Sequence, residues 1–311
     1  MGSLLVNRNE GKALGNILVL GGTQFFGKKL VYKLLGNGLN VTIATRGLNK
    51  DPFGDKVERL IIDRENKSSL EEAFANGNWD IVYDQSCQSP QEALDTVGAL
   101  KGKAKRYIFT STQAVYEYGT QWREEDFMPE HFSFDYKSRK QYVGYEGYQE
   151  AKRASETVLF TQSDFEVVAV RFPLVIGKDD FTGRLKFHVD KVLNNDQIGI
   201  ANPTCRYSFI LSDEAAEFLY KIGHSSFSGT INPGCAEDIS LKDLVGKIEN
   251  RVGKSANIIN DAPVANTSPY ALPGSWSINT EKANRLGYQF SDLHTILNEL
   301  IDYYFAIDQD K

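Results

Sequence analysis

A tyrosine and a lysine lie four positions apart in the segment GYQEAKRASE, residues 147–156. On a helix, Tyr148 and Lys152 would share one face. A phenol beside an ammonium can work as an acid/base pair, because the positive charge favours the phenolate form. Glu156 extends the same face by one turn and could pair with Lys152. The alternative interpretation is an exposed helix that carries these side chains without any chemistry.

A second pair with the same spacing, Tyr136 and Lys140, shows how readily the pattern arises. It lies in the polar stretch DYKSRKQ, which offers no apolar helical face. The residues after Tyr148 do provide such a face, at Ala151, Ala154, Val158 and Leu159. A helix with this face can pack on a sheet, so we predict that Tyr148 is the acid/base.

Hydroxyl side chains end the apolar run of residues 107–112, at Thr110, Ser111 and Thr112. A hydroxyl at the carboxyl end of a buried strand can hydrogen-bond a substrate oxygen next to the tyrosine. The alternative is a strand end whose Ser and Thr side chains satisfy their own backbone.

A glycine turn follows the first apolar run, in NILVLGGTQFFGKKLV, residues 16–31. A buried strand, a turn and a helix in this order direct the N–H groups of the helix at a pyrophosphate. Gly21 and Gly27 fill the outer positions of G-x-x-G-x-x-G, but Gln24 holds the middle one. We expect Gln24 either to displace a dinucleotide slightly or to contribute its own amide. A tight turn that binds nothing is the alternative.

Strands and helices alternate along the first half of the chain, which predicts an α/β fold. Apolar runs predict strands at residues 16–20, 41–45, 57–62, 79–83, 106–110 and 165–172. Helical patterns occur from residue 25 and at residues 68–76, 90–100 and 147–162. Such alternation is typical of a Rossmann-type, doubly wound parallel sheet. Residues 117–147 interrupt it and predict a long loop or short lid.

The chain becomes less regular after Pro173, where helices are expected at residues 182–194, 212–222, 240–252 and 291–305. We predict a Rossmann domain at residues 15–173, completed by parts of 207–233. Residues 174–311 would form mainly a smaller, substrate-binding lobe. This lobe should lie over the carboxyl ends of the strands, where open α/β sheets bind ligands.

The charge, the apolar runs and the cysteine and histidine content of the chain argue against several classes of protein. The 311 residues carry a net charge of −6 and no run of five basic residues, which argues against a nucleic-acid partner. No apolar run reaches the roughly 18 residues of a membrane-spanning helix. The first residues lack the apolar core of a secretory signal, and the three cysteines are scattered, so we expect a cytoplasmic protein. The four histidines form no metal-ligand cluster in the sequence.

Taken together, the motifs resemble the extended short-chain dehydrogenases/reductases of the NAD-dependent epimerase/dehydratase family. The resemblance runs from about residue 16 to about residue 287. It rests on GGTQFFG, STQAVY, YQEAK, RFPLVIG and RYSFILSDEAA, in this order. Their order and spacing are more specific than any one of them.

The resemblance implies a catalytic set of Ser/Thr, Tyr and Lys. By register, Thr112 takes the Ser/Thr role and Tyr148 is the acid/base. Lys152 would bind the nicotinamide ribose and support Tyr148. The implied cofactor-binding residues are Gly21, Gly22, Thr23, Gln24, Phe25, Gly27, Arg46, Asp63, Arg64, Ser86, Lys152 and Pro173.

Arg46 follows the second predicted strand, where NAD-preferring members of the family carry an acidic residue. An arginine there suits a 2′-phosphate, so we expect NADP as cofactor, with NAD as the alternative if Arg46 only stacks on adenine. Asp63 and Arg64, after the third strand, resemble the family's adenine contact.

Arg206 resembles the arginine that often meets a nucleotide-sugar phosphate, and Gln113 is the second substrate contact that we expect. The alternative for Arg206 is a surface ion pair, for example with Asp213 or Glu214. Dehydratase members carry an acidic pair after the catalytic threonine. Gln113 and Ala114 stand there in this sequence, which disfavours 4,6-dehydration.

The function that the resemblance implies is an NAD(P)-dependent epimerase or reductase. Its substrate would be a hydroxyl or keto group of a sugar, expected to be nucleotide-linked. The second hypothesis is a cofactor-binding or RNA-associated protein of the same fold with little or no catalysis. It arises because the GGT-x-F-x-G turn with T-R-G also resembles a branch that includes chloroplast stem-loop RNA-binding proteins. The catalytic set favours the enzyme, and we expect a monomer or a homodimer.

Overall fold

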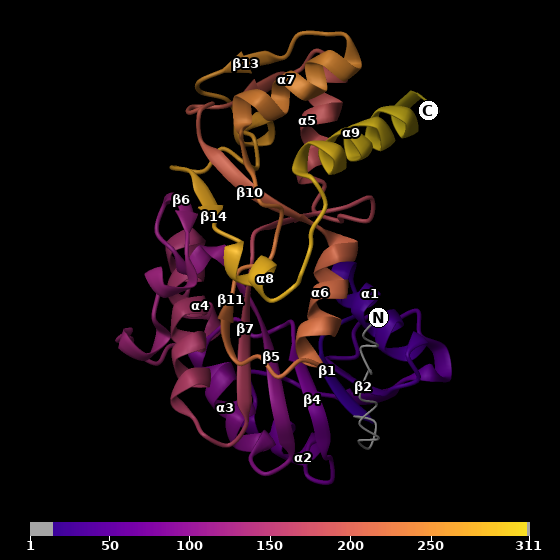
Figure 1. Ribbon diagram of the computed structural model, residues 1–311, viewed down its shortest axis with the longest axis vertical. Coiled ribbons are helices and arrows are strands. Elements are labelled where there is room, and N and C mark those ends of the chain that lie inside the picture. The colour runs from indigo at the N-terminus through magenta and orange to yellow at the C-terminus, as the bar shows by residue number, and fades with distance from the viewer. Residues whose placement is uncertain (1–14, 310–311) are drawn as a thin grey trace, which may run out of the picture.

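The computed structural model, which describes residues 15–309, is built on a seven-stranded parallel sheet (Figure 1). The strand order is β11-β7-β5-β4-β1-β2-β3. The strands are β1 (Asn16–Leu20), β2 (Asn40–Thr45), β3 (Glu58–Ile61), β4 (Trp79–Asp84), β5 (Ala104–Thr112), β7 (Glu166–Phe172) and β11 (Gly229–Ile231). The chain winds outward in both directions from β1 and β4, so the predicted fold class is confirmed. Ligands of such sheets bind at this reversal, beyond the carboxyl ends of the strands.

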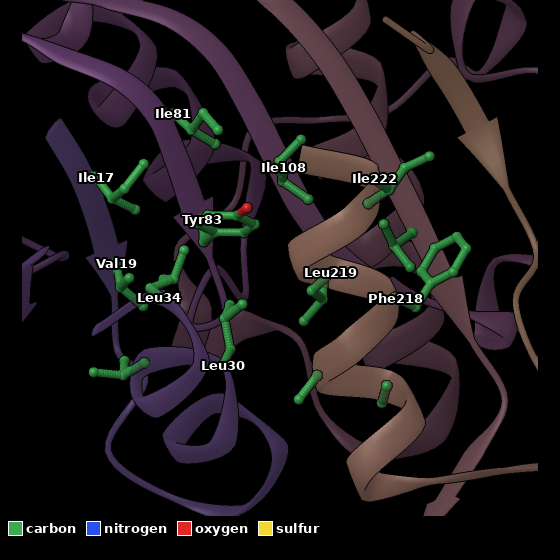
Figure 2. Close-up of a cluster of buried hydrophobic side chains, with 14 of the residues drawn as sticks. Ile17, Val19, Leu30, Leu34, Ile81, Tyr83, Ile108, Phe218, Leu219 and Ile222 are labelled. Atoms are coloured by element: carbon green, nitrogen blue, oxygen red, sulfur yellow. The ribbon is translucent and has the colours of Figure 1, made fainter. Parts of the chain in front are cut away.

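Each face of the sheet is covered by helices, because successive side chains of a strand point to opposite faces. Ile17 and Val19 contribute to the core beneath α1 (Phe25–Gly36) and α6 (Ser212–Gly223). Figure 2 shows this core, with Leu30 and Leu34 from α1 beside Leu219 from α6 on the same face of the sheet.

The opposite face is covered by α2 (Lys67–Ala73), α3 (Pro90–Leu100) and α4 (Gly144–Thr161). Leu18 and Leu20 pack there with Val97 and Leu159. Because both faces are buried, the central strands are almost continuously apolar, which is why their positions are readable in the sequence.

A second, smaller sheet has the order β12-β10-β14-β6, with β8 paired to β10. Its strands are β6 (Gly119–Trp122), β8 (Leu174–Ile176), β10 (Arg206–Leu211), β12 (Asp238–Ser240) and β14 (Trp276–Ile278). The helices α5 (Arg184–Leu193), α7 (Leu241–Val252) and α9 (Leu293–Gln309) gather beside it at one end of the molecule (Figure 1). The short strands β9 (Gln197–Gly199) and β13 (Asn257–Ile259) complete this part. The short helix α8 (Glu281–Arg285) instead contributes Ala283 to the core beneath α1 and α6.

The segment of residues 117–147 differs in two respects from the predicted loop: it contains a strand, and α4 begins inside it at Gly144. It contains short 3₁₀ turns, as an irregular segment would, but also β6, which pairs with β14 at Gly119 and Trp276. Its aromatic side chains contact one another in succession, at Phe127, Phe132, Phe134 and Tyr136. The hydroxyl of Thr157 donates to the carbonyl oxygen of Pro129 at 2.9 Å, which fastens the segment to α4.

No helix within residues 15–309 combines the length and apolar character needed to cross a membrane. Within the same residues, no group of His, Cys, Asp or Glu side chains is arranged to hold a metal ion. Cys87, Cys205 and Cys235 are free and buried.

Candidate active site

A cavity of about 560 Å³ lies at the carboxyl ends of the central strands, between the large sheet and the second lobe. It brings together eleven residues that the sequence predicted for the site: Gly21, Gly22, Thr23, Gln24, Phe25, Gly27, Thr112, Gln113, Tyr148, Lys152 and Pro173. Pro269, Leu272 and Trp276 close it from the second lobe.

The glycine turn has the geometry of a phosphate-binding corner. Gly21 and Gly22 have φ of 92° and 76°, values that favour glycine. A Cβ on Gly27 would lie 1.9 Å from Oε1 of Gln85 and 3.1 Å from Cα of Gly22, so a side chain there would displace Gln85 and press on the turn. Gln24 has an extended backbone with φ of −134°, so no glycine is required at this position. The departure from the family pattern therefore leaves the turn intact.

The helix that follows the turn is open to an anion. Within the described residues, α1 has no side-chain cap at its N-terminus and no acidic residue in its first turn. Its free N–H groups and the positive end of its dipole therefore remain available. A turn that favours glycine and an uncapped helix end beside a cavity fit the pyrophosphate of a dinucleotide.

Tyr148 and Lys152 both lie in α4 and both line the cavity. Tyr148 is 37% exposed, which leaves its phenol accessible, whereas Lys152 is 6% exposed. The ammonium of Lys152 donates to the carbonyl oxygens of Cys87 and Thr110 at 2.9 and 3.0 Å. An ammonium has three N–H donors, so one remains for a ligand.

Hydroxyl and amide groups surround this pair at the end of β5. Oγ1 of Thr112 accepts from the N–H of Ala114 at 3.2 Å, so its own proton stays free to be donated. Within the described residues, Oγ1 of Thr110 and Oε1 of Gln113 are buried without a hydrogen-bond partner. Gln113 is 3% exposed and lines the cavity, so a donor on a ligand would satisfy it.

Glu156 does not pair with Lys152, although the helical spacing allowed it. Its carboxylate instead accepts from the guanidinium of Arg171 and the hydroxyl of Ser111. The three side chains are buried beneath α4, so Glu156 has a structural role.

The second Tyr-x-x-x-Lys pair lies outside any α-helix. Tyr136 precedes a short 3₁₀ turn, Arg139–Gln141, and its ring contacts that of Phe134 at 5.0 Å. Neither Tyr136 nor Lys140 is among the residues that line the cavity. Arg139 in the same turn donates to the carbonyl oxygen of Ser86 at 3.0 Å and so holds the segment beside the cavity.

Three further predicted cofactor residues lie along the carboxyl edge of the sheet, outside the cavity wall. Arg46 follows β2 directly, is exposed, and makes no ion pair within residues 15–309. Asp63 lies just beyond β3 and accepts from the N–H of Glu65 at 3.0 Å. Ser86 lies beside Gly21, since a Cβ on that glycine would be 3.5 Å from the Cβ of Ser86.

The structure does not bring Arg64 to the cavity wall. Its side chain is 7% exposed and donates to Asp84 at 2.5 Å and to Thr96 at 3.0 Å. Burial alone would raise the pKa of Asp84, but the Arg64 charge and several hydrogen bonds outweigh it and hold this pKa below its usual value. Arg64 is thus committed to an internal ion pair, which the sequence could not reveal.

Arg206 likewise lies away from the cavity. Its Nε donates to Asp238 at 2.6 Å, and Nη2 donates to the carbonyl oxygen of the same residue at 2.8 Å. It borders a separate surface hollow with Glu237 and Asp243, whose charges would repel a phosphate. The antiparallel pairing of β10 with β12 sets this position and supplies the ion-pair partner, in place of Asp213 or Glu214.

Sequence reasoning missed several residues that line the cavity: Gln85, Gln88, Tyr145, Phe181, Arg184 and Trp276. Gln85 follows β4 directly, and this position at the end of a strand was a usable signal. Arg184 and Trp276 had no local signal, because only the packing of the second lobe places them here.

The family model described as "NAD dependent epimerase/dehydratase family" matches residues 17–231. This match covers more than half of the chain, so the protein belongs to the NAD-dependent epimerase/dehydratase family.

Several solved structures share the fold. UDP-glucose 4-epimerase of Thermus thermophilus, in complex with NAD, is 20% identical, with 93% of this chain and 98% of that chain covered at a TM-score of 0.69. The same enzyme of Thermotoga maritima, with UDP-glucose, is 17% identical, with coverage of 93% and 98% and a TM-score of 0.70. The dTDP-glucose 4,6-dehydratase of Bacillus anthracis, in complex with NAD, is 14% identical, with 93% of this chain and 96% of that chain covered at a TM-score of 0.70. At these identities the likeness establishes the fold.

A curated relative is the chloroplast stem-loop binding protein of 41 kDa b of Arabidopsis thaliana. It is 30% identical over 130 residues, which are 37% of this chain and 33% of the relative. The match thus spans about a third of that protein's length.

Proposed function

We propose that the protein is a nicotinamide-dinucleotide-dependent epimerase or reductase that acts on a hydroxyl or keto group of a nucleotide-linked sugar. The observation that carries this proposal is the position of Thr112, Tyr148 and Lys152 in one cavity with the glycine turn. The solved relatives bound to NAD or to UDP-glucose support the same class of ligand.

The cofactor would lie along the carboxyl edge of the sheet. The glycine turn and the N-terminus of α1 would hold its pyrophosphate. Ser86 and Asp63 would lie beside the adenosine half, and Arg46 would bind a 2′-phosphate, which favours NADP over NAD. The remaining N–H donor of Lys152 would bind the nicotinamide ribose.

The chain's own groups handle the proton of the reaction. When bound, a nicotinamide dinucleotide supplies the reversible acceptor for the hydride of the substrate carbon. The phenol oxygen of Tyr148 takes the hydroxyl proton in one direction and returns it in the other. Thr112 donates a hydrogen bond to the same substrate oxygen. Leu272 and Trp276 line the same cavity and would shield a bound substrate from water.

The second candidate is an RNA-associated protein of the same fold. The observation that favours it is the relative that binds a chloroplast stem-loop. The net charge of −6 weighs against it, because phosphate affinity requires clustered basic residues.

The deciding experiment identifies the nucleotide that copurifies with the protein by mass spectrometry. The protein is then incubated with UDP-glucose and UDP-N-acetylglucosamine, and NMR follows the sugar protons for epimerisation. Loss of NADPH absorbance with keto sugars would indicate the reductase. An absence of any dinucleotide, together with tight filter binding of an RNA stem-loop, would favour the second candidate.

A further inference from the structure

Two cationic side chains line the cavity, Lys152 and Arg184, and none of the described residues that line it is acidic. Lys152 is already bound to backbone carbonyl oxygens and lies beside the catalytic phenol. Arg184 belongs to the second lobe, where it is the first residue of α5. The charge of Arg184 has no role in the chemistry proposed above.

Arg184 differs from most arginines of the protein in having no carboxylate partner. Within residues 15–309, Arg46, Arg184 and Arg285 make no ion pair, whereas the other arginines do. Of these three, Arg184 lines the cavity. A guanidinium that reaches a carboxylate, that of Asp180, only through the hydroxyl of Thr182, on a wall without acids, fits an anionic ligand.

The N-terminus of α5 adds its own partial positive charge beside the guanidinium. Arg184 begins a ten-residue helix that, in the described structure, has no acidic residue in its first turn and no side-chain cap. A cation at a helix N-terminus adds to the positive end of the dipole and destabilises the helix slightly. An anion bound there would remove this conflict.

Neighbouring residues orient the guanidinium. Oδ1 of Asp180 accepts from the hydroxyl of Thr182 at 2.5 Å, and Oγ1 of Thr182 accepts from Nε of Arg184 at 3.0 Å. This holds Nε, while the two terminal amino groups have no hydrogen bond to described residues. Those groups form the planar fork that binds phosphate oxygens in pairs.

An independent observation points to a ligand in the same cavity. The buried amide oxygen of Gln113 lacks a partner within the described residues, and a sugar hydroxyl could donate to it. Arg206, which the sequence favoured for the phosphate, is bound to Asp238 in a separate hollow.

We propose that Arg184, rather than Arg206, anchors the diphosphate of the nucleotide-linked sugar, with Gln113 accepting a hydrogen bond from the sugar. This inference rests on the proposed function and names the residue that selects a phosphorylated substrate. Arg184 is a binding residue, because it would touch the substrate away from the reacting atoms.

The test is calorimetric binding of UDP-, dTDP-, GDP- and ADP-glucose to the cofactor-loaded protein. For the sugar nucleotide that the wild type binds best, we expect Arg184→Gln to lower the affinity by roughly 10- to 100-fold, because a charge-assisted bidentate contact is lost. The affinity of Arg184→Lys for the sugar nucleotide should lie between those of the wild type and Arg184→Gln, since lysine keeps the charge but not the planar guanidinium fork. The matched control, Arg206→Gln, should bind like the wild type. Cofactor affinity should be unchanged in all variants, which verifies their folding.

Two results would overturn the inference while leaving the proposed function standing. One is that the wild type binds a sugar nucleotide and Arg184→Gln binds it with the same affinity. The other is a larger loss in Arg206→Gln than in Arg184→Gln. If the cofactor-loaded wild type binds none of the four sugar nucleotides, the proposed nucleotide-sugar substrate fails and the inference fails with it.

Discussion

Glu156 and Arg171 form an ion pair in which both side chains are completely buried. Nε of Arg171 lies 3.1 and 3.2 Å from the two carboxylate oxygens, and Nη2 lies 2.6 Å from one of them. The pair joins α4 to β7 one helical turn beyond Lys152. It therefore fixes the helix that carries the candidate acid/base to the strand that leads into Pro173.

Replacing one partner of this pair should cost much of the protein's stability. Glu156→Gln leaves the Arg171 charge buried without its counter-charge, so we expect the free energy of unfolding to fall by about 3–5 kcal/mol. Urea denaturation measures this. Glu150→Gln is the control, since it breaks a partly exposed pair with Lys137 on the same helix and should cost about 1 kcal/mol or less. Equal losses in the two variants would contradict the structural role of Glu156.

Tyr148→Phe should lower turnover by roughly 10²–10⁴-fold, because the group that moves the proton is gone. Cofactor binding, measured by calorimetry, should stay near the wild-type value. Tyr136→Phe removes the corresponding hydroxyl from the second Tyr-x-x-x-Lys pair and should leave turnover unchanged. A larger effect of Tyr136→Phe would mean that the acid/base was assigned to the wrong tyrosine.

Arg46→Ala should weaken NADP(H) binding more than NAD(H) binding, because only NADP(H) offers a 2′-phosphate for a charge-assisted contact. Calorimetry with each cofactor gives the ratio of the wild-type affinity to the variant affinity for NADP(H) and for NAD(H). Arg285→Ala is a suitable control, since within residues 15–309 that arginine also makes no ion pair and it does not line the cavity. Equal losses for the two cofactors would remove Arg46 from the phosphate role.

Gly27→Ala should displace Gln85, because the new methyl group would lie 1.9 Å from its amide oxygen. The displaced side chain would project toward the dinucleotide, so we expect cofactor affinity to fall about tenfold, equivalent to ~1.4 kcal/mol. The double variant Gly27→Ala/Gln85→Ala should recover part of this loss, because the new methyl group still lies 3.1 Å from Cα of Gly22. Gly36→Ala, in the same helix and with no described atom within 4 Å of the added Cβ, should not affect binding. Failure of the double variant to recover would place the steric conflict elsewhere.

His188 should make stability depend on pH. Burial lowers the pKa of His188 from 6.5 to about 4, so the imidazole stays neutral in the folded protein. The unfolded chain binds a proton near pH 6.5 and the folded protein only near pH 4, so the free energy of unfolding falls as the pH drops between these values. The total loss is at most about 3 kcal/mol.

Urea denaturation at pH 7 and pH 5 measures the effect of His188. The variant His188→Gln should be less stable at pH 7, because the ring nitrogens lie 2.8 Å from the carbonyl oxygen of Arg184 and 2.7 Å from the hydroxyl of Ser268. Its stability should nevertheless change less between the two pH values. His294 is exposed, so the control variant His294→Gln should keep the wild-type pH dependence of stability. A loss of that dependence in His294→Gln would mean that His294, and not His188, causes it.

The parallel sheet and its helices could be predicted from the sequence because their signals are local. The helix predicted at residues 90–100 is α3 at the same bounds, and the strand predicted at residues 79–83 is β4, one residue longer. Strands buried on both faces are apolar throughout, and helices packed on them repeat every three to four residues. The same logic preferred Tyr148 to Tyr136, since only Tyr148 precedes an apolar helical face.

The environments of three arginines were decided by the tertiary structure alone. Arg64, Arg184 and Arg206 are alike in the sequence, yet one is in a buried ion pair, one lines the cavity and one pairs with Asp238 at the surface. The strands beside Arg206 are short, since β12 and β14 have three residues each, and both pair with β10 from distant positions in the chain. A strand of three residues is too short to show a periodicity in the sequence. The partner of an arginine, in turn, depends on which distant segment folds beside it. The sequence by itself thus determined the fold and the helix that carries the candidate acid/base, whereas three-dimensional packing determined which arginine reaches the cavity.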